Sequence, residues 1–162
     1  MLDQEDMAQF GGADLYYPTS SAREVRAELR LGDIGPEAGI GFPAWVAAIT
    51  PRLQDVMTLR SDWNSYGARP IEFSNLQAAV DLLKWIMRPN TPSPIIMPTS
   101  DGSLQLEWHE RGLDLEIRVR GRGRYYANVE DSRTLDGNWE GMITADLTQL
   151  KNVVEDLTGR SD

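Results

Sequence analysis

An alternation of apolar and polar residues between positions 104 and 129 is the strongest pattern in this chain. A period of two is typical of a strand with one buried face, and glycine-containing turns separate three such runs. We therefore predict three consecutive antiparallel strands. Residues 94–98 and 139–144 are candidates for two more, the first at an edge because of its prolines. The alternating apolar positions are Leu104, Leu106 and Trp108, then Leu113, Leu115, Ile117 and Val119, then Tyr125 to Val129.

Helical spacing of apolar residues occurs on both sides of these strands. It predicts a short helix over 21–29, and one kinked helix or two short helices over 43–57. It also predicts a helix over 74–87 capped by Ser74, and a last helix that begins after Asp146 and ends at Gly159. The chain is thus predicted to be α+β, with N-terminal short helices, a central three- to five-stranded antiparallel meander and a C-terminal helix packed on one sheet face.

Length and composition fit one domain, since the 162 residues are 41% hydrophobic and 25% charged. We expect residues 21–162 to form a single α+β domain. We expect residues 1–20, which include Tyr16 and Tyr17, to form a flexible or partner-docking arm. No run of about 18 apolar residues occurs, and the first ten residues are acidic where a secretory signal is basic. These features predict a cytoplasmic protein with no membrane partner.

The residue types present limit the chemistry. The chain has no cysteine and one histidine, His109, which excludes disulfides, thiolate metal sites and cysteine nucleophiles. No phosphate loop, dinucleotide fingerprint or metal-ligand spacing is found. We therefore expect no cofactor, no metal and no catalytic residue, and we favour a binding protein over an enzyme.

Charge is unevenly distributed along the chain. The net charge of −9 disfavours nonspecific binding to nucleic-acid phosphates. One short stretch is nevertheless basic, because it contains Arg118, Arg120, Arg122 and Arg124. A β-ribbon with these arginines could enter a nucleic-acid groove, with Tyr125 or Tyr126 stacked on a base. The same ribbon could dock an acidic partner surface or the acidic arm of this chain, or it could be a solvated glycine-rich turn without a binding role.

Carboxylates are concentrated on one predicted hairpin. Glu107, His109, Asp114 and Glu116 should share its polar face, where cross-strand neighbours lie about 5 Å apart. Groups at that separation could share a divalent ion, which makes a carboxylate-metal hydrolase a further alternative. The simpler interpretation is a solvated strand face with charge pairing to nearby arginines.

Two segments resemble a known family. Residues 63–71, Trp-Asn-Ser-Tyr-Gly-Ala-Arg-Pro-Ile, and residues 98–108, Pro-Thr-Ser-Asp-Gly-Ser-Leu-Gln-Leu-Glu-Trp, are similar to a widespread, functionally uncharacterised family of small bacterial proteins. That family has a Trp-x-x-Tyr-Gly-x-x-Pro turn and an Asp-Gly…Glu-Trp strand, and Asn64 stands where an aspartate is expected. The resemblance covers roughly residues 59–120. It implies an accessory or neutralising role of the kind encoded in mobile or defence islands, and it implies no catalytic residue.

Our leading hypothesis is a non-catalytic protein-binding accessory module of a bacterial or phage system, such as an antitoxin-like, immunity or counterdefence factor. Its acidic surface and aromatic residues would meet a basic partner. The aromatic candidates are Trp63, Tyr66, Tyr16 and Tyr17. Nucleic-acid binding through the arginine hairpin is the alternative, and homo-oligomerisation stays open.

Overall fold

The computed structural model describes residues 28–30 and 42–161. The arm predicted over 1–20, with Tyr16 and Tyr17, and most of the helix predicted over 21–29 lie outside the described residues. Within the described ranges, no helix is long and apolar enough to cross a membrane.

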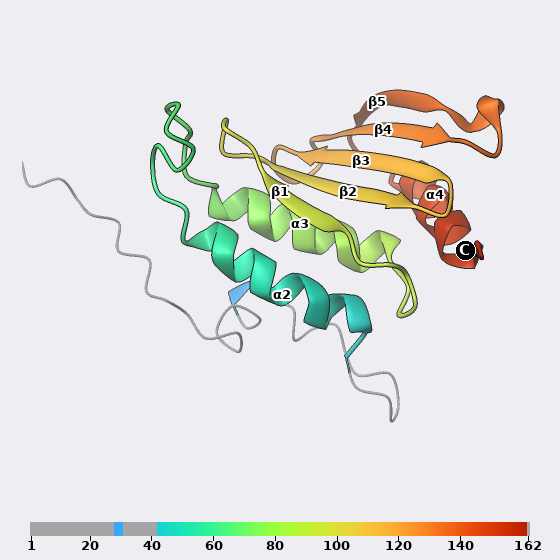
Figure 1. Ribbon diagram of the computed structural model, residues 1–162, viewed down its shortest axis with the longest axis horizontal. Helices are drawn as coiled ribbons and strands as arrows, with labels where there is room; N and C mark the ends of the chain where they lie inside the picture. Colours follow the sequence, from blue (N-terminus) through green and yellow to red (C-terminus); the bar gives the residue numbers. More distant parts are fainter. Residues whose placement is uncertain (1–27, 31–41, 162) are drawn as a thin grey trace, which may run out of the picture.

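A five-stranded antiparallel meander forms the centre of the protein (Figure 1). Its strands lie side by side in chain order, so every connection joins neighbours. This confirms the predicted meander, including the two additional strands. The strands are β1 (Ile95–Pro98), β2 (Leu104–Glu110), β3 (Leu113–Val119), β4 (Tyr125–Asp131) and β5 (Trp139–Ile143).

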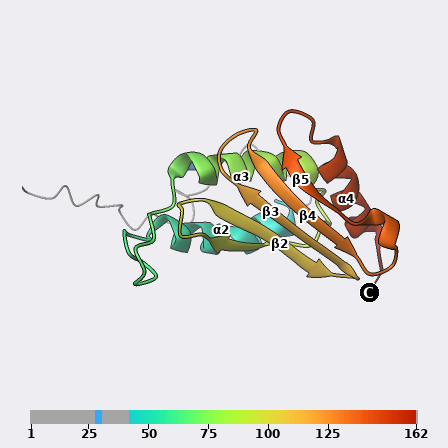
Figure 2. The same cartoon turned by 90° about the horizontal axis from the view of Figure 1, so that it is seen from above.

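Three α-helices of the described chain pack on one face of this sheet (Figure 2). They are α2 (Ala44–Met57), α3 (Phe73–Ile86) and α4 (Thr148–Gly159), and a short 3₁₀ turn, η2 (Leu135–Gly137), precedes β5. The C-terminal helix on one sheet face was predicted and is confirmed. Pro51 lies inside α2, which stays a single helix. Pro51 and Ala47 are both exposed, so water can solvate the carbonyl that loses its backbone donor.

Both predicted helix caps are displaced by one residue or more. Helix α3 begins at Phe73, so Ser74 lies in its first turn and is not the N-cap. The reason is tertiary: Glu72 N–H donates to the carbonyl of Gly102 at 3.2 Å, which fixes the backbone just before the helix. Before α4, Leu147 takes the N-cap position, although Asp146 Oδ1 still accepts the Thr148 N–H at 2.8 Å.

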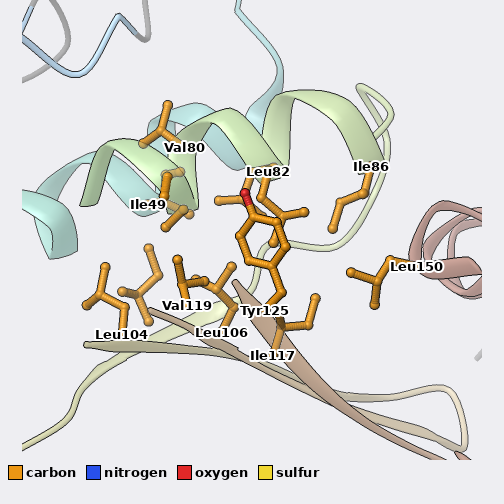
Figure 3. Close-up of a cluster of buried hydrophobic side chains, with 14 of the residues drawn as sticks. Ile49, Val80, Leu82, Ile86, Leu104, Leu106, Ile117, Val119, Tyr125 and Leu150 are labelled. Atoms are coloured by element: carbon orange, nitrogen blue, oxygen red, sulfur yellow. The ribbon is translucent and has the colours of Figure 1, made fainter. Parts of the chain in front are cut away.

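The core lies between the helices and the sheet face that they cover (Figure 3). Every second side chain of β2 and β3 points into it, as the alternation predicted. Figure 3 shows Leu106, Ile117 and Tyr125 beneath the helices, and Tyr125 is only 3% exposed. Burying a large apolar side chain contributes about 1.5–3 kcal/mol, so this register is strongly fixed.

Candidate functional site

The second face of the sheet has no described helix over it, and we call it the open face (Figure 2). The strand alternation that buries one set of side chains places the other set here. Its middle is anionic, while apolar side chains occur near its edges. The open face consists of Ile95, Met97, Gln105, Glu107, His109, Asp114, Glu116, Arg118, Tyr126, Asn128, Glu130, Glu140 and Met142.

A pair of like charges lies at the centre of the open face. Glu107 on β2 is directly opposite Glu116 on β3. The side-chain amide of Gln105 bridges them, because Nε2 donates to Glu107 Oε1 at 2.9 Å and to Glu116 Oε2 at 3.1 Å. Like charges at directly opposite positions destabilise a sheet. The free protein therefore carries an electrostatic cost at this point.

The single histidine lies between two of the carboxylates. His109 Nδ1 is 2.7 Å from Asp114 Oδ1, and its Nε2 is 3.3 Å from Glu107 Oε2. The hydrogen bond to Asp114, followed by that to Glu107, raises the pKa of His109 above 6.5. A protonated His109 thus offsets part of the negative charge of the open face.

The carboxylates that the sequence suggested for a divalent ion are engaged by Gln105 and His109. Within residues 28–30 and 42–161, no group of three or more histidine, aspartate or glutamate side chains is placed to hold a metal ion.

The loop before α3 is rigidly bonded and presents one aromatic ring to solvent. Asp62 and Ser65 have φ angles of 63° and 62°, and Gly67 has 79°. Positive φ values are strained for the two non-glycine residues. Side-chain acceptors hold the loop, since Asp62 Oδ1 accepts the Gly67 N–H at 2.7 Å and Asn64 Oδ1 accepts the Tyr66 N–H at 2.9 Å. Tyr66 is 90% exposed on this frame.

Trp63 has a different role from Tyr66. Its indole N–H donates to the carbonyl of Arg69 at 3.0 Å, and the residue is half-buried. Trp63 therefore holds the loop closed, whereas Tyr66 is the residue that a partner could reach. The sequence marked both rings as candidate anchors and did not separate these roles.

The two segments that carry the family resemblance meet in space. The Arg69 N–H donates to Ser100 O at 2.9 Å, and Asn75 Nδ2 donates to Gly102 O at 2.8 Å. Gly102 has a φ of 81°, and a Cβ there would lie 2.9 Å from Pro70 O. Glycine is thus required by both conformation and space. The two motifs form one structural unit, although they are far apart in the chain.

The arginine hairpin lies at the same end of the sheet as this unit. Arg118 is opposite Tyr126 on the open face, and Arg120 Nη2 is 3.1 Å from Asp101 Oδ2. Arg122 and Arg124 are exposed in the β3–β4 turn, and neither makes an ion pair within the described part of the chain. We call loop 62–70, turn 99–103 and turn 120–124 together the turn end.

One predicted residue is misplaced. Tyr125 was expected to stack on a base beside the arginines, but its ring is buried in the core beneath the helices (Figure 3). The strand alternation explains the correction, because Tyr125 has the inward parity of Ala127 and Val129. Tyr126, which is 39% exposed, is the hairpin aromatic on the open face.

Asp101 organises the β1–β2 turn within the turn end. Its Oδ1 accepts the Thr99 and Ser103 hydroxyls, each at 2.6 Å. These hydrogen bonds, with that to Ser103 first, lower the pKa of Asp101 well below 3.8, and Arg120 adds to the effect.

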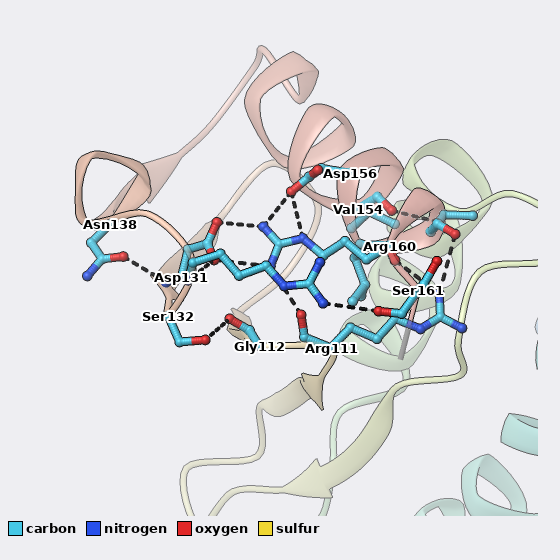
Figure 4. A network of polar contacts seen from close by, with 12 residues as sticks. Arg111, Gly112, Asp131, Ser132, Asn138, Val154, Asp156, Arg160 and Ser161 are labelled. Atoms are coloured by element: carbon cyan, nitrogen blue, oxygen red, sulfur yellow. Dashed lines mark hydrogen bonds and ion pairs between the residues drawn. The ribbon is translucent and has the colours of Figure 1, made fainter.

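A buried ion network at the opposite end of the sheet was not predicted (Figure 4). Arg160 follows α4 and binds Asp131 with two nitrogens, Nη1 to Oδ1 at 3.1 Å and Nη2 to Oδ2 at 2.5 Å. Their side chains are 8% and 7% exposed. Arg160 Nη2 also donates to Asp156 Oδ2 at 2.6 Å, and Arg111 Nη1 donates to Leu157 O at 3.1 Å. We call this region the C-terminal end.

A groove on the helical side was also missed. It has a volume of about 420 Å³ and lies between α3 and the start of α4. Trp85, which is 66% exposed, forms one wall, and Lys151 Nζ lies 5.9 Å from the centre of its ring. Helical spacing could have shown that Trp85 lies off the apolar stripe of α3.

The described surface therefore offers an anionic open face and a turn end that contains the exposed Tyr66 and two arginines, Arg122 and Arg124, without an ion pair in the described ranges. Both are recognition surfaces in chemical terms, since charged groups and amphipathic rings are what protein partners contact. No protein-family model, curated protein or solved structure matches this chain.

Proposed function

We propose that this chain is a non-catalytic protein-binding module that holds a basic partner on the open face. The biological setting suggested by the resemblance is a bacterial or phage system, in which the chain would be an antitoxin-like, immunity or counterdefence factor. The observation that carries the proposal is the like-charged Glu107–Glu116 pair at the centre of a sheet face that no described helix covers.

A cationic partner group explains why such a pair is tolerated. In the free protein, opposed glutamates repel each other and only Gln105 bridges them. A lysine or arginine side chain of a partner would turn this repulsion into attraction on binding. Sites that break a local stability rule are expected where a protein binds something.

The neighbouring residues strengthen the anionic character of this face. Asp114, Glu130 and Glu140 lie around the central pair, whereas Arg118 is the only arginine or lysine among the open-face residues. A phosphate backbone across this face would meet these carboxylates. The charge pattern therefore favours a basic protein over nucleic acid here.

The test uses the double variant E107Q/E116Q, which removes the two charges, keeps the side-chain size and leaves one acceptor oxygen at each position for Gln105 Nε2. The protein is immobilised and exposed to a native lysate, and a basic protein retained in stoichiometric amount is purified and titrated by calorimetry. We expect the double variant to lose that binding while its thermal midpoint rises by up to about 4 °C, because the like-charge repulsion is gone.

A matched control removes the same charge elsewhere. E28Q/D55N changes two exposed acidic residues away from the open face and should bind like wild type. The proposal is wrong if no stoichiometric basic protein is retained, or if E107Q/E116Q and E28Q/D55N bind the purified partner equally well.

A second candidate, nucleic-acid binding, is favoured by one observation at the turn end. Arg122 and Arg124 have no ion-pair partner in the described ranges, and Arg118 is opposite the exposed ring of Tyr126. This arrangement predicts salt-dependent binding of single-stranded nucleic acid that R118A/R120A/R122A/R124A loses. Fluorescence anisotropy at low salt measures it, and absence of binding by wild type removes this candidate.

A further inference from the structure

The two edges of the sheet are treated differently. At the β1 edge, Arg52 of α2 donates from Nε to the carbonyl of Ile96 at 2.8 Å, and α2 packs against the strand. Pro94 and Pro98 remove backbone donors at the same edge. Helices, prolines and side chains that bond the backbone are the usual means by which proteins prevent edge-to-edge pairing.

The β5 edge has none of these protections in the described part of the chain. Strand β5 contains no proline and no lysine, and it is the outermost strand of the sheet (Figure 1). Its only described backbone partner is β4. On the open face, Met142 is 63% exposed at this edge. An unpaired edge of this kind is a template for a further strand.

We propose that β5 pairs antiparallel with β5 of a second copy of this chain. The twofold axis of such a pair is perpendicular to the sheet, so the two sheets join into one and both open faces lie on the same side. We assign the edge to a second copy because β5 can pair with itself over its full length without placing like charges opposite each other.

The register follows from strand geometry. Directly opposite residues must point to the same face, so a residue of β5 must lie on the axis. Placing Gly141 there pairs all five residues of β5, with Trp139 opposite the partner's Ile143 and Glu140 opposite the partner's Met142. A Cβ at Gly141 would meet nothing within 4 Å in the single chain, so the position is open for a close approach.

The neighbouring registers are worse. An axis at Glu140 would put two glutamates directly opposite each other, which is unfavourable. An axis at Met142 would leave Trp139 without a partner inside the strand. Only the Gly141 register pairs all five residues of β5 and keeps the two Glu140 side chains from lying directly opposite each other.

The pairing has a consequence for the open face. Two anionic faces on the same side of one sheet would bind a repetitive or dimeric basic partner more tightly than one face, because the second contact is intramolecular. This consequence rests on the proposed function, but the dimer itself does not.

The test measures molar mass by light scattering and sedimentation over a wide dilution series of the full chain. Wild type is expected to be a dimer that dissociates on dilution. M142E places a carboxylate opposite Glu140 at two symmetric positions, so we expect at least about a tenfold rise in the dissociation constant. M142K, which places an ammonium group opposite Glu140, is expected to keep or tighten the dimer.

A compensating variant makes the register testable. E140K/M142E restores opposite charges across the axis and is expected to dimerise again. Because Met142 and Glu140 are both exposed, each variant should keep the circular dichroism spectrum of the folded chain. The proposal is overturned if wild type is monomeric throughout, if M142E dimerises as well as wild type, or if E140K/M142E stays monomeric. M142E keeps Glu107 and Glu116, so loss of the dimer and loss of the basic partner can be told apart.

Discussion

The two ends of the sheet use arginine in opposite ways. At the C-terminal end, Arg160 is buried, and Asp131, Asp156 and the carbonyl of Arg111 accept from its guanidinium nitrogens (Figure 4). At the turn end, Arg122 and Arg124 are exposed without an ion-pair partner in the described ranges. The same residue type thus fixes structure at one end and is available for recognition at the other.

The difference arises from burial and chain connectivity. Arg160 follows α4 directly, so its bonds to Asp131 on β4 attach the end of the helix to the end of the sheet. Arg122 and Arg124 of the β3–β4 turn extend from a tight hairpin and are exposed to solvent. A charge that is buried must be paired, whereas an exposed one is solvated by water.

The largest expected effect is at the C-terminal end. D131A removes a buried partner of Arg160 and leaves that guanidinium with one carboxylate, so we expect a loss of about 3 kcal/mol in the free energy of unfolding. Urea denaturation measures it. A loss below about 1 kcal/mol would show that the buried network is not what distinguishes the two ends.

An intermediate effect is expected within the turn end, at Asp101. D101N keeps the shape of the side chain but weakens the hydrogen bonds to Thr99 and Ser103, with an expected loss of about 1 kcal/mol near neutral pH. The lowered pKa adds a pH signature. The carboxylate contributes stability above its unfolded pKa, near 3.8, and this contribution declines as the pH falls from there toward the lower folded pKa.

The difference between wild type and D101N should therefore shrink in acid, in denaturation experiments followed at a series of pH values. S100A, which leaves the backbone carbonyl of Ser100 in place, is a control in the same turn. A difference that is independent of pH would mean that Asp101 stabilises the turn through packing and not through its charge.

The smallest effect is expected for Arg122 and Arg124, which make no ion pair in the described ranges. R122A/R124A should change the free energy of unfolding by no more than about 0.5 kcal/mol, because no described interaction is lost. Thermal denaturation beside D131A gives the direct comparison of the two ends. A loss as large as that of D131A would show that these arginines are structural and would remove the turn end as a recognition surface.

Much of the fold could be predicted, because most of its strands and helices follow from the periodicity of apolar residues along the chain. The alternation around Leu106 and Ile117 predicted the central strands, and the apolar stripe of α3 predicted its covering helix. The predicted start of a helix was wrong where a contact with a distant segment of the chain sets that start. The start of α3 is set by Gly102 rather than by Ser74, and this contact has no local signature in the sequence.

The candidate sites were likewise predictable in part: strand alternation gave the shared face of a carboxylate pair, but not the separate roles of two aromatic residues. The sequence placed Glu107 and Glu116 on one polar face, and the structure shows that they are directly opposite. The sequence could not separate Trp63 from Tyr66, because both are aromatic residues in one polar loop. Only the hydrogen bond from Trp63 to Arg69 O shows which ring closes the loop and which is presented to solvent.

By itself, then, the sequence determined the strands, the helices and the two faces of the sheet, since periodicity of two or 3.6 residues is a local property of the chain. Tertiary structure alone decided that residues 63–71 and 98–108 form one unit, that Arg160 joins α4 to β4, and that one sheet edge is protected while the other has no partner in the described part of the chain. These features depend on contacts between residues far apart in the chain, and such contacts leave no periodic signal in the sequence.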